Sequence, residues 1–138
     1  MAVTQNIGQE ININPIDLQD SRAVGVIFPF NGNAVFRSSY TTQQQVKSNL
    51  INVLLTEPGE RVYEPNFGVG LKSQLFEQQI KEDELEARIK DQVAFHVPEI
   101  EITNLVLQVV PDEHTLYIRL TYKFLLDNNE DSIQLNFR

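Results

Sequence analysis

The chain has 138 residues, a length that suits one domain and buries roughly 68–70% of the surface its unfolded form exposes. Its formal net charge is −8 and its eleven lysine and arginine residues are scattered singly, which excludes nucleic acid as an expected partner. The chain has no cysteine, no apolar run near the roughly 20 residues of a membrane helix, and no visible secretory signal. We therefore expect a domain made in a cytosol, without cofactor or membrane. Its acidity either keeps it soluble or attracts basic protein surfaces.

Residues 1–20 are rich in Gln, Asn and isolated Ile, and they predict a flexible N-terminal arm before a single domain at residues 21–138. The alternation of Ile11 and Ile13 also fits a strand added to a partner, and a frayed terminus is favoured over it. From Val24 to Phe36 apolar residues flank Asn31-Gly32, a pair typical of tight hairpin turns. This segment predicts a short, irregular hairpin at a sheet edge.

Three helices are predicted. The first runs from Gln43 to Thr56, after a capping box that begins at Thr41 or Thr42. Four residues at helical spacing form its buried face: Val46, Leu50, Val53 and Leu54. A short helix is expected from Leu71 to Glu77, and a third from Glu82 to Phe95, where acidic residues favour its start and Pro98 ends it.

The C-terminal part has a period of two and predicts three strands, Ile100–Val110, Thr115–Leu126 and Ser132–Phe137. The apolar phase slips near Asn104, which indicates a bulge or bend. In the middle strand the apolar face runs through Leu126 and the other face is polar. The expected fold class is α+β, with a small antiparallel or mixed sheet covered on one face by the two longer helices.

A turn-rich segment joins the first two helices. Its residues Pro58, Gly59, Pro65, Phe67 and Gly68 are expected to fix the backbone path, with Val62-Tyr63 as a short extended piece between them.

Together with their neighbours these residues resemble the signature of the baseplate wedge and sheath-initiator family of contractile phage tails, which also occurs in related injection machines. The matching positions are Leu54-Leu55-Thr56, Pro58-Gly59-Glu60-Arg61, Pro65, Phe67-Gly68, Leu71 and Leu75-Phe76-Glu77, with Gly25 to Phe30 upstream. The resemblance covers residues 21–138.

The resemblance implies a structural, non-enzymatic component of the virion tail baseplate, present in the host cytoplasm during assembly. It implies a handshake module like that of sheath subunits, in which a sheet edge is offered to the first sheath ring while the opposite side binds the wedge. The partners implied are the tail sheath protein, the wedge proteins and neighbours in the tail tube or hub. The sheath-binding edge would be Ser132, Ile133, Gln134, Leu135, Asn136, Phe137 and Arg138, by strand addition. That last strand equally fits a role in closing the domain's own sheet.

The wedge contact is expected at Glu60, Arg61, Pro98 and Glu99. Arg61 either locks its turn beside Glu60 or reaches a partner carboxylate. Relatives carry a Glu-Pro-Arg triplet after their last helix, whereas the aligned positions here read Val97-Pro98-Glu99, so that only the proline matches.

The alternative is a peptidoglycan-degrading, lysozyme-like enzyme, a label that members of this family have sometimes carried. Glu57, Glu60 and Glu64 lie close in sequence, and glycoside hydrolysis needs two carboxylates about 5–9.5 Å apart. A solvated turn with a salt bridge to Arg61 is favoured, because the chain has no tryptophan to line a sugar cleft. No catalytic residue is therefore assigned. No metal site is expected either, since the only histidines, His96 and His114, have no second ligand at a suitable spacing.

Overall fold

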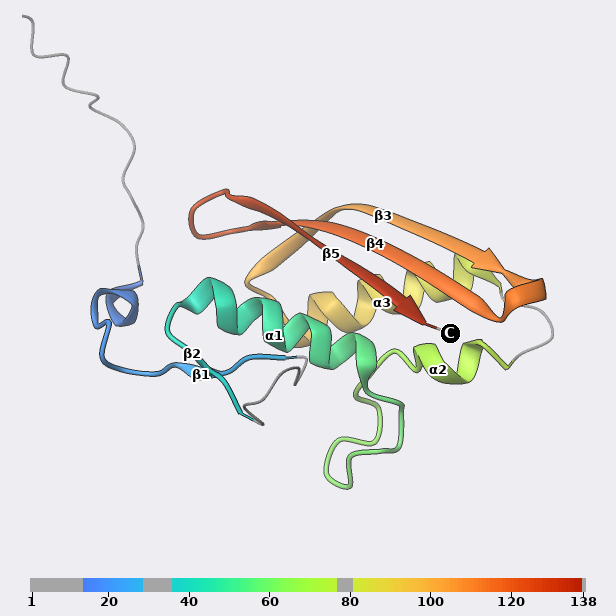
Figure 1. Cartoon of the computed structure of the whole chain (residues 1–138), viewed down its shortest axis with the longest axis horizontal. Coiled ribbons are helices and arrows are strands. Elements are labelled where there is room, and N and C mark those ends of the chain that lie inside the picture. Colours follow the sequence, from blue (N-terminus) through green and yellow to red (C-terminus); the bar gives the residue numbers. More distant parts are fainter. Residues whose placement is uncertain (1–13, 29–35, 77–80, 138) are drawn as a thin grey trace, which may run out of the picture.

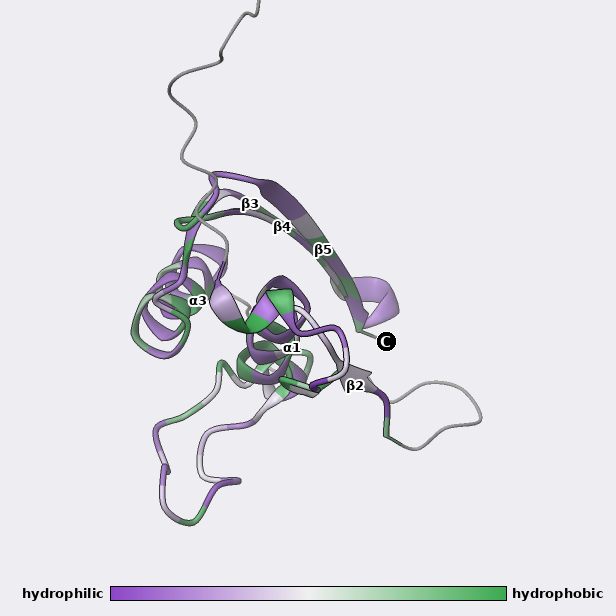
Figure 2. Cartoon of the chain, turned by 90° about the vertical axis from the view of Figure 1, so that its left-hand side faces the viewer, coloured by the Kyte–Doolittle hydropathy of each residue, from purple (hydrophilic) through white to green (hydrophobic). Residues whose placement is uncertain are grey.

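The computed structural model describes residues 14–28, 36–76 and 81–137. The main sheet is antiparallel with the order β3-β4-β5, formed by β3 (Ile100–Val110), β4 (Thr115–Phe124) and β5 (Glu130–Phe137). Helices α1 (Thr42–Leu55) and α3 (Glu82–His96) cover one face of this sheet, and the short helix α2 (Leu71–Gln74) follows α1 along the same layer (Figures 1 and 2). This arrangement confirms the predicted α+β class. None of the described helices is long and apolar enough to cross a membrane.

The core lies between the sheet and the two long helices. Strand β4 contributes alternate residues that are almost fully buried, because it is the central strand and the helices cover that face. The described core consists of Val46, Leu50, Ile51, Val53, Leu54, Phe67, Val69, Leu71, Leu85, Ile89, Val93, Val97, Ile100, Leu116, Ile118, Leu120, Tyr122, Phe124, Ile133 and Phe137. Every apolar position predicted for the buried face of the first helix belongs to this set.

The predicted bulge in β3 is confirmed, since the register between β3 and β4 shifts between Ile102 and Asn104. The prediction for the middle strand was too long by two residues. The chain leaves β4 after Phe124, whose N–H donates to the carbonyl of Asn129, and Asn128 adopts a positive φ of 58° in the turn. Leu126 therefore lies in the hairpin turn and is 49% exposed, rather than on the apolar face of a strand.

Helix α1 begins one residue earlier than predicted, with Thr41 as its N-cap. The Thr41 hydroxyl accepts a hydrogen bond from the N–H of Gln44 at 3.3 Å. The side chain of Gln44 reaches back, as in a capping box, but it accepts from the N–H of Tyr40 rather than from that of the cap residue.

The hairpin predicted at a sheet edge near residue 24 does not lie at an edge of the main sheet. Strands β1 (Gly25–Val26) and β2 (Ser38–Ser39) pair with each other in a separate two-stranded sheet beside α1, and not at an edge of the main sheet. Close packing holds them there: a Cβ on Gly25 would lie 2.0 Å from Oε1 of Gln45, which also accepts from the Ser39 hydroxyl at 2.6 Å. The predicted Asn31-Gly32 turn lies outside the described residues.

Part of the predicted N-terminal arm, residues 1–13, also lies outside the described residues, as do Glu77 and Arg138. The following segment forms a 3-10 helix, η1 (Pro15–Leu18), and a second one, η2 (Pro111–Glu113), joins β3 to β4. Asp17 in η1 accepts hydrogen bonds from the N–H and the hydroxyl of Thr42 at 2.7 and 2.8 Å. A carboxylate at this end of α1 also complements the helix dipole.

Candidate interaction surfaces

The free edge of β5 is the first candidate surface. In the β4–β5 hairpin, the N–H of Phe124 donates to Asn129, and the register continues from Lys123–Glu130 to Leu116–Phe137. Hydrogen-bonded and non-hydrogen-bonded pairs alternate along an antiparallel ladder. The backbone groups that point away from β4 are therefore those of Glu130, Ser132, Gln134 and Asn136. We call these four residues the β5 edge, and among the described strands none pairs with it.

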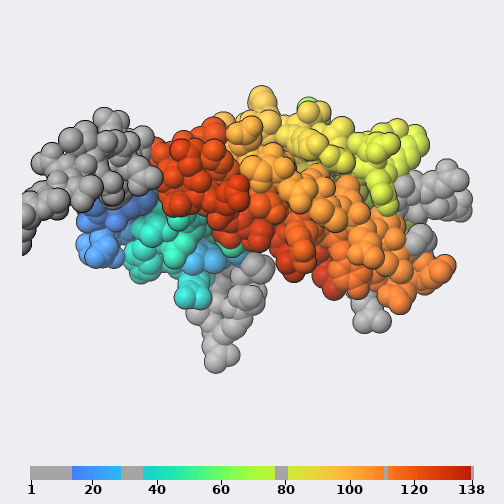
Figure 3. All heavy atoms as spheres, turned by 90° about the horizontal axis from the view of Figure 1, so that it is seen from above, coloured from blue at the N-terminus to red at the C-terminus, as the bar shows by residue number. Residues whose placement is uncertain are grey.

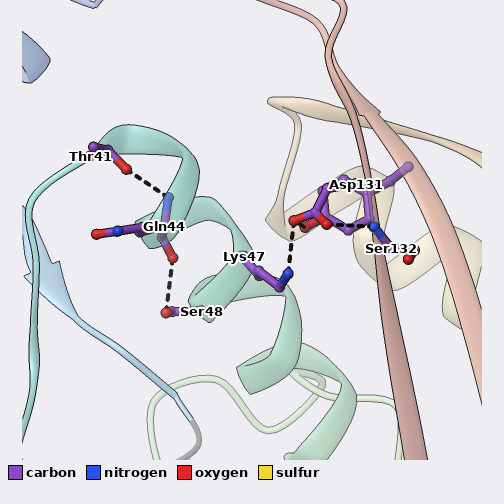
Figure 4. Close-up of polar contacts among 7 residues, drawn as sticks. Thr41, Gln44, Lys47, Ser48, Asp131 and Ser132 are labelled. Atoms are coloured by element: carbon purple, nitrogen blue, oxygen red, sulfur yellow. Dashed lines mark hydrogen bonds and ion pairs between the residues drawn. The ribbon is translucent and has the colours of Figure 1, made fainter.

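One end of the β5 edge is tied to α1 through Asp131 (Figure 4). Its Oδ2 atom lies 2.8 Å from Nζ of Lys47 and accepts from the hydroxyl of Tyr122 at 3.1 Å. Its Oδ1 atom accepts from the N–H of Ser132 at 2.7 Å. The carboxylate thus joins the helix layer, the central strand and the edge strand at one point.

The electrostatics of this cluster follow from its partners. Burial by itself raises the pKa of Asp131, but the hydrogen bond from Lys47, the N–H of Ser132 and the Lys47 charge together hold that pKa below its usual value. Burial, followed by the negative charge of Asp131 and the hydrogen bond to it, raises the pKa of Tyr122. The phenol therefore stays a hydrogen-bond donor to a charged carboxylate.

The outer face of the sheet is formed by β3, β4 and β5, as Figure 3 shows from above, and the side chains that β5 places on it are polar. Arg119 and Gln134 are opposite each other in the register. With the Gln134 amide oriented so that its oxygen faces Arg119, that oxygen accepts from Nε and Nη2 at 3.1 Å each. The side chain of Gln134 is thus held on the outer face, while its backbone groups point to the free edge.

The second candidate surface is the loop of residues 57–66, which projects from the side of the helix layer opposite the sheet (Figures 1 and 2). A hydrogen bond of 2.8 Å from the N–H of Gly59 to the carbonyl of Pro65 closes its base. Val62 and Tyr63 at its tip are 88% and 98% exposed. The short extended piece predicted at these two residues does not form a strand, because they pair with no described strand and form bends instead.

Arg61 connects this loop to the end of α3. It pairs with Glu64 at 3.1 Å, rather than with Glu60, and its guanidinium lies 3.6 Å from the centre of the Phe67 ring. The Phe67 ring in turn meets His96 edge-on at 4.5 Å. The stack formed by Arg61, Phe67 and His96 therefore brings the loop next to the C-terminal end of α3.

This stack draws together the two segments predicted to contact the wedge. Pro98 and Glu99 follow His96 after the buried Val97 and are exposed, and Phe95, next to His96, is 80% exposed. We call the loop tip Val62-Tyr63 together with Phe95, Pro98 and Glu99 the loop surface. Sequence reasoning missed the exposed Phe95 and the ring contact of His96, although an aromatic residue beside a helix stop was a visible signal.

The glycine corner after the loop is held by backbone contacts. Gly68 has a φ of 105° and its N–H donates to Oε1 of Gln92 at 2.9 Å, while the N–H of Gly70 donates to the carbonyl of Thr56 at 3.2 Å. A Cβ on Gly68 would lie 2.2 Å from the same Thr56 oxygen. Only glycine fits there, as expected from the turn-rich sequence.

The three carboxylates considered for catalysis have structural partners. Glu57 accepts from the N–H of Lys72 at 2.8 Å and from the hydroxyl of Ser73 at 3.0 Å, so that it holds the first turn of α2. Glu60 accepts from the N–H of Glu57 at 3.1 Å, and Glu64 is paired with Arg61. In the described part of the chain no group of three or more acidic or histidine side chains is placed to bind a metal ion.

Comparison with known proteins identifies a family and a solved structure that are similar to this chain. Residues 41–129 match the family described as "Baseplate wedge protein gp25". The chain is 29% identical over 99 residues to the baseplate wedge protein gp25 of Enterobacteria phage T4, covering 69% of this chain and 73% of the relative. A crystal structure from Geobacter sulfurreducens, of a protein described as a proposed tail lysozyme, has the same fold, with a TM-score of 0.60, 22% identity, and coverage of 70% of this chain and 90% of that one.

A second solved structure is the cryo-EM baseplate of the anti-feeding prophage, of which one chain has a TM-score of 0.46 and 20% identity, covering 80% of this chain and 81% of that one. The family match spans more than half of the sequence, from the cap of α1 to the turn before β5. This protein belongs to the baseplate wedge protein gp25 family.

Proposed function

We propose that the protein is a structural part of a contractile tail baseplate that binds the wedge through the loop surface and starts the tail sheath at the β5 edge. The observation that carries this proposal is that a strand edge without a partner among the described strands and the exposed side chains of the loop surface belong to the same small domain. The β5 edge belongs to the sheet layer, and the loop projects from the far side of the helix layer (Figures 1 and 2). One molecule can therefore hold two partners without steric conflict.

Strand addition is the mechanism at the β5 edge. Its outward N–H and carbonyl groups offer hydrogen bonds to an extended segment of the sheath protein. Ile133 and Phe137, which lie on the inward face of β5, are buried in the core and keep the strand in place. The edge is thus presented by a strand that does not have to be ordered on binding, which lowers the entropic cost of association.

At the loop surface, the exposed side chains of Val62, Tyr63 and Phe95 supply apolar area, and amphipathic tyrosine is favoured at protein interfaces. The stack of Arg61 on Phe67 holds the loop before the partner arrives. Pro98 and Glu99 would form the rim of the contact. We assign wedge binding to this surface because it combines both predicted segments with the largest exposed apolar side chains of the loop.

The proposed role needs no catalysis. The carboxylates of Glu57, Glu60 and Glu64 bind the first turn of α2, the N–H of Glu57 and Arg61, which supports a structural role for these three residues. The fold shared with the Geobacter protein described as a proposed tail lysozyme carries no activity by itself.

The test is seeded sheath growth from isolated baseplates that contain the protein, with sheath subunits of the same genome, counted by electron microscopy. Deleting β5 would also remove core residues, so we use Gln134→Pro. Proline removes the outward N–H of the β5 edge, leaves the ladder to β4 intact, and is tolerated on edge strands. Gln134→Ala is the matched control, because it loses the same side chain but keeps the N–H.

We expect sheaths on baseplates with wild-type protein or Gln134→Ala, and a loss of at least ten-fold with Gln134→Pro. Asn136→Pro repeats the test at the next outward N–H if the first variant unfolds in urea more readily than the control. Full sheath growth with a folded proline variant would rule out strand addition at this edge. Growth without the protein would rule out the initiating role altogether.

A further inference from the structure

The β5 edge is not uniform along its length. Of its outward N–H groups, that of Ser132 already has an acceptor within the chain, Oδ1 of Asp131 at 2.7 Å. Within the described part of the chain the N–H groups of Gln134 and Asn136 have no such acceptor, and the Gln134 side chain is turned to Arg119 on the outer face. An added strand therefore meets an occupied end near the hairpin and an open end beyond Ile133.

At the occupied end, other contacts hold Asp131 in the position in which it accepts from the Ser132 N–H. Asp131 is in phase with Ile133, Leu135 and Phe137, so its side chain projects toward the helices. There Lys47 and Tyr122 hold Oδ2. The other oxygen, Oδ1, accepts from the N–H of Ser132 (Figure 4). A charged residue that points inward on an edge strand is a known means of preventing unwanted pairing. Breaking the bond to Ser132 would also leave part of a carboxylate without its donor.

We infer that Asp131 sets the register of strand addition, so that the incoming sheath segment pairs with Gln134 and Asn136 and stops before Ser132. This inference rests on the proposed function, since it concerns the same edge. The open part from Ile133 to Phe137 extends about 17 Å at roughly 3.4 Å per residue. The segment that fits is short and extended, with alternate apolar residues on the side of Leu135, which is only partly buried.

The measurement is amide hydrogen exchange by NMR on the full chain, alone and with purified sheath protein of the same genome. In the free protein we expect the N–H of Ser132 to exchange at least ten-fold more slowly than those of Gln134 and Asn136. On adding sheath protein, Gln134 and Asn136 should slow at least ten-fold while Ser132 stays unchanged.

The variant is Asp131→Ala, which removes the acceptor of the Ser132 N–H. Asp127→Ala is the matched control, because Asp127 also carries one charge in the same hairpin and also bonds α1, through Gln43, but it does not touch the edge N–H. In Asp131→Ala the Ser132 N–H should exchange as fast as its neighbours when free, and become protected with sheath protein. Asp127→Ala should leave both patterns as in the wild type.

The outcomes separate the two ideas. Wild-type protection that extends to Ser132 on binding, or fast exchange of Ser132 in the free protein, overturns the role of Asp131 and leaves sheath binding at β5 intact. Protection of none of the three amides overturns sheath binding at this edge, and the register role with it.

Discussion

Replacing Gly68 by alanine tests the corner that joins the projecting loop to the core. The φ of 105° is one that residues with a side chain rarely adopt, and such strain costs about 1–3 kcal/mol. In addition, the new Cβ would lie 2.2 Å from the Thr56 carbonyl oxygen, so the backbone has to move. That movement weakens two hydrogen bonds, from Gly68 to Gln92 and from Gly70 to Thr56, each worth about 0.5–1.5 kcal/mol.

Gly59→Ala is the control that isolates the contact. Gly59 also has a positive φ, of 89°, but nothing lies within 4 Å of its added Cβ. The two variants therefore share the strain and differ in the clash. We expect Gly68→Ala to lower the free energy of unfolding by about 1–3 kcal/mol more than Gly59→Ala does, the sum of the two weakened hydrogen bonds.

The assay is urea unfolding followed by circular dichroism, with the slope m compared between variants to confirm that only the stability changes. Equal urea midpoints for the two variants would refute the reasoning, because they would mean that the approach to Thr56 does not constrain the corner. A larger loss in Gly68→Ala than in Gly59→Ala would show that the loop is held in place by the close packing of a backbone against a backbone.

Three further predictions concern the polar contacts and the loop. Because the pKa of Asp131 is lower in the folded protein than its ordinary value of 3.8, its contribution is present above that value and is lost as the pH falls through the folded pKa. The pair is 40% exposed on both sides, so Lys47→Met should cost about 0.2–1 kcal/mol near neutral pH and nothing in strong acid, by urea unfolding at each pH. Glu57→Gln should lower stability by about 1 kcal/mol through the α2 turn without changing the rate at which a peptidoglycan suspension clears, and a change in clearing would revive the enzyme hypothesis. Tyr63→Ser should leave unfolding unchanged and reduce incorporation into baseplates, measured by quantitative immunoblotting, whereas normal incorporation would remove the loop tip from the wedge contact.

The elements that were predicted correctly are those whose local pattern and tertiary environment agree. Strand Ile100–Val110 has its predicted bounds. Its sequence alternates with a period of two because the helices cover only one face of the sheet. Leu126 continues the alternation of the middle strand, but it lies in the hairpin turn. Asn128 in this turn has a positive φ, which the alternation does not reveal. Local pattern determined the strands, and turn geometry determined where they end.

The contacts that define the candidate surfaces were harder to predict. The helical spacing of residues 43–56 does not indicate a partner for Lys47, which pairs with Asp131, 84 positions away in the sequence, because β5 returns over α1. For Arg61 the sequence leaves two roles open, locking its turn and reaching a partner. Arg61 contacts Glu64 and the Phe67 ring. These contacts depend on the closure of the loop between Gly59 and Pro65. Such pairs arise from the fold, and a single sequence carries no period that marks them.

The hairpin order of the main sheet has a mechanical consequence for a baseplate wedge component of a contractile tail. The hydrogen bonds between β4 and β5 run perpendicular to the strands along the register from Lys123–Glu130 to Leu116–Phe137. A tension directed along β5 therefore loads these bonds together in shear, whereas a tension directed away from the sheet would open them one pair at a time. If the sheath binds by strand addition as we propose, a pull along the added strand would be resisted by the whole ladder at once.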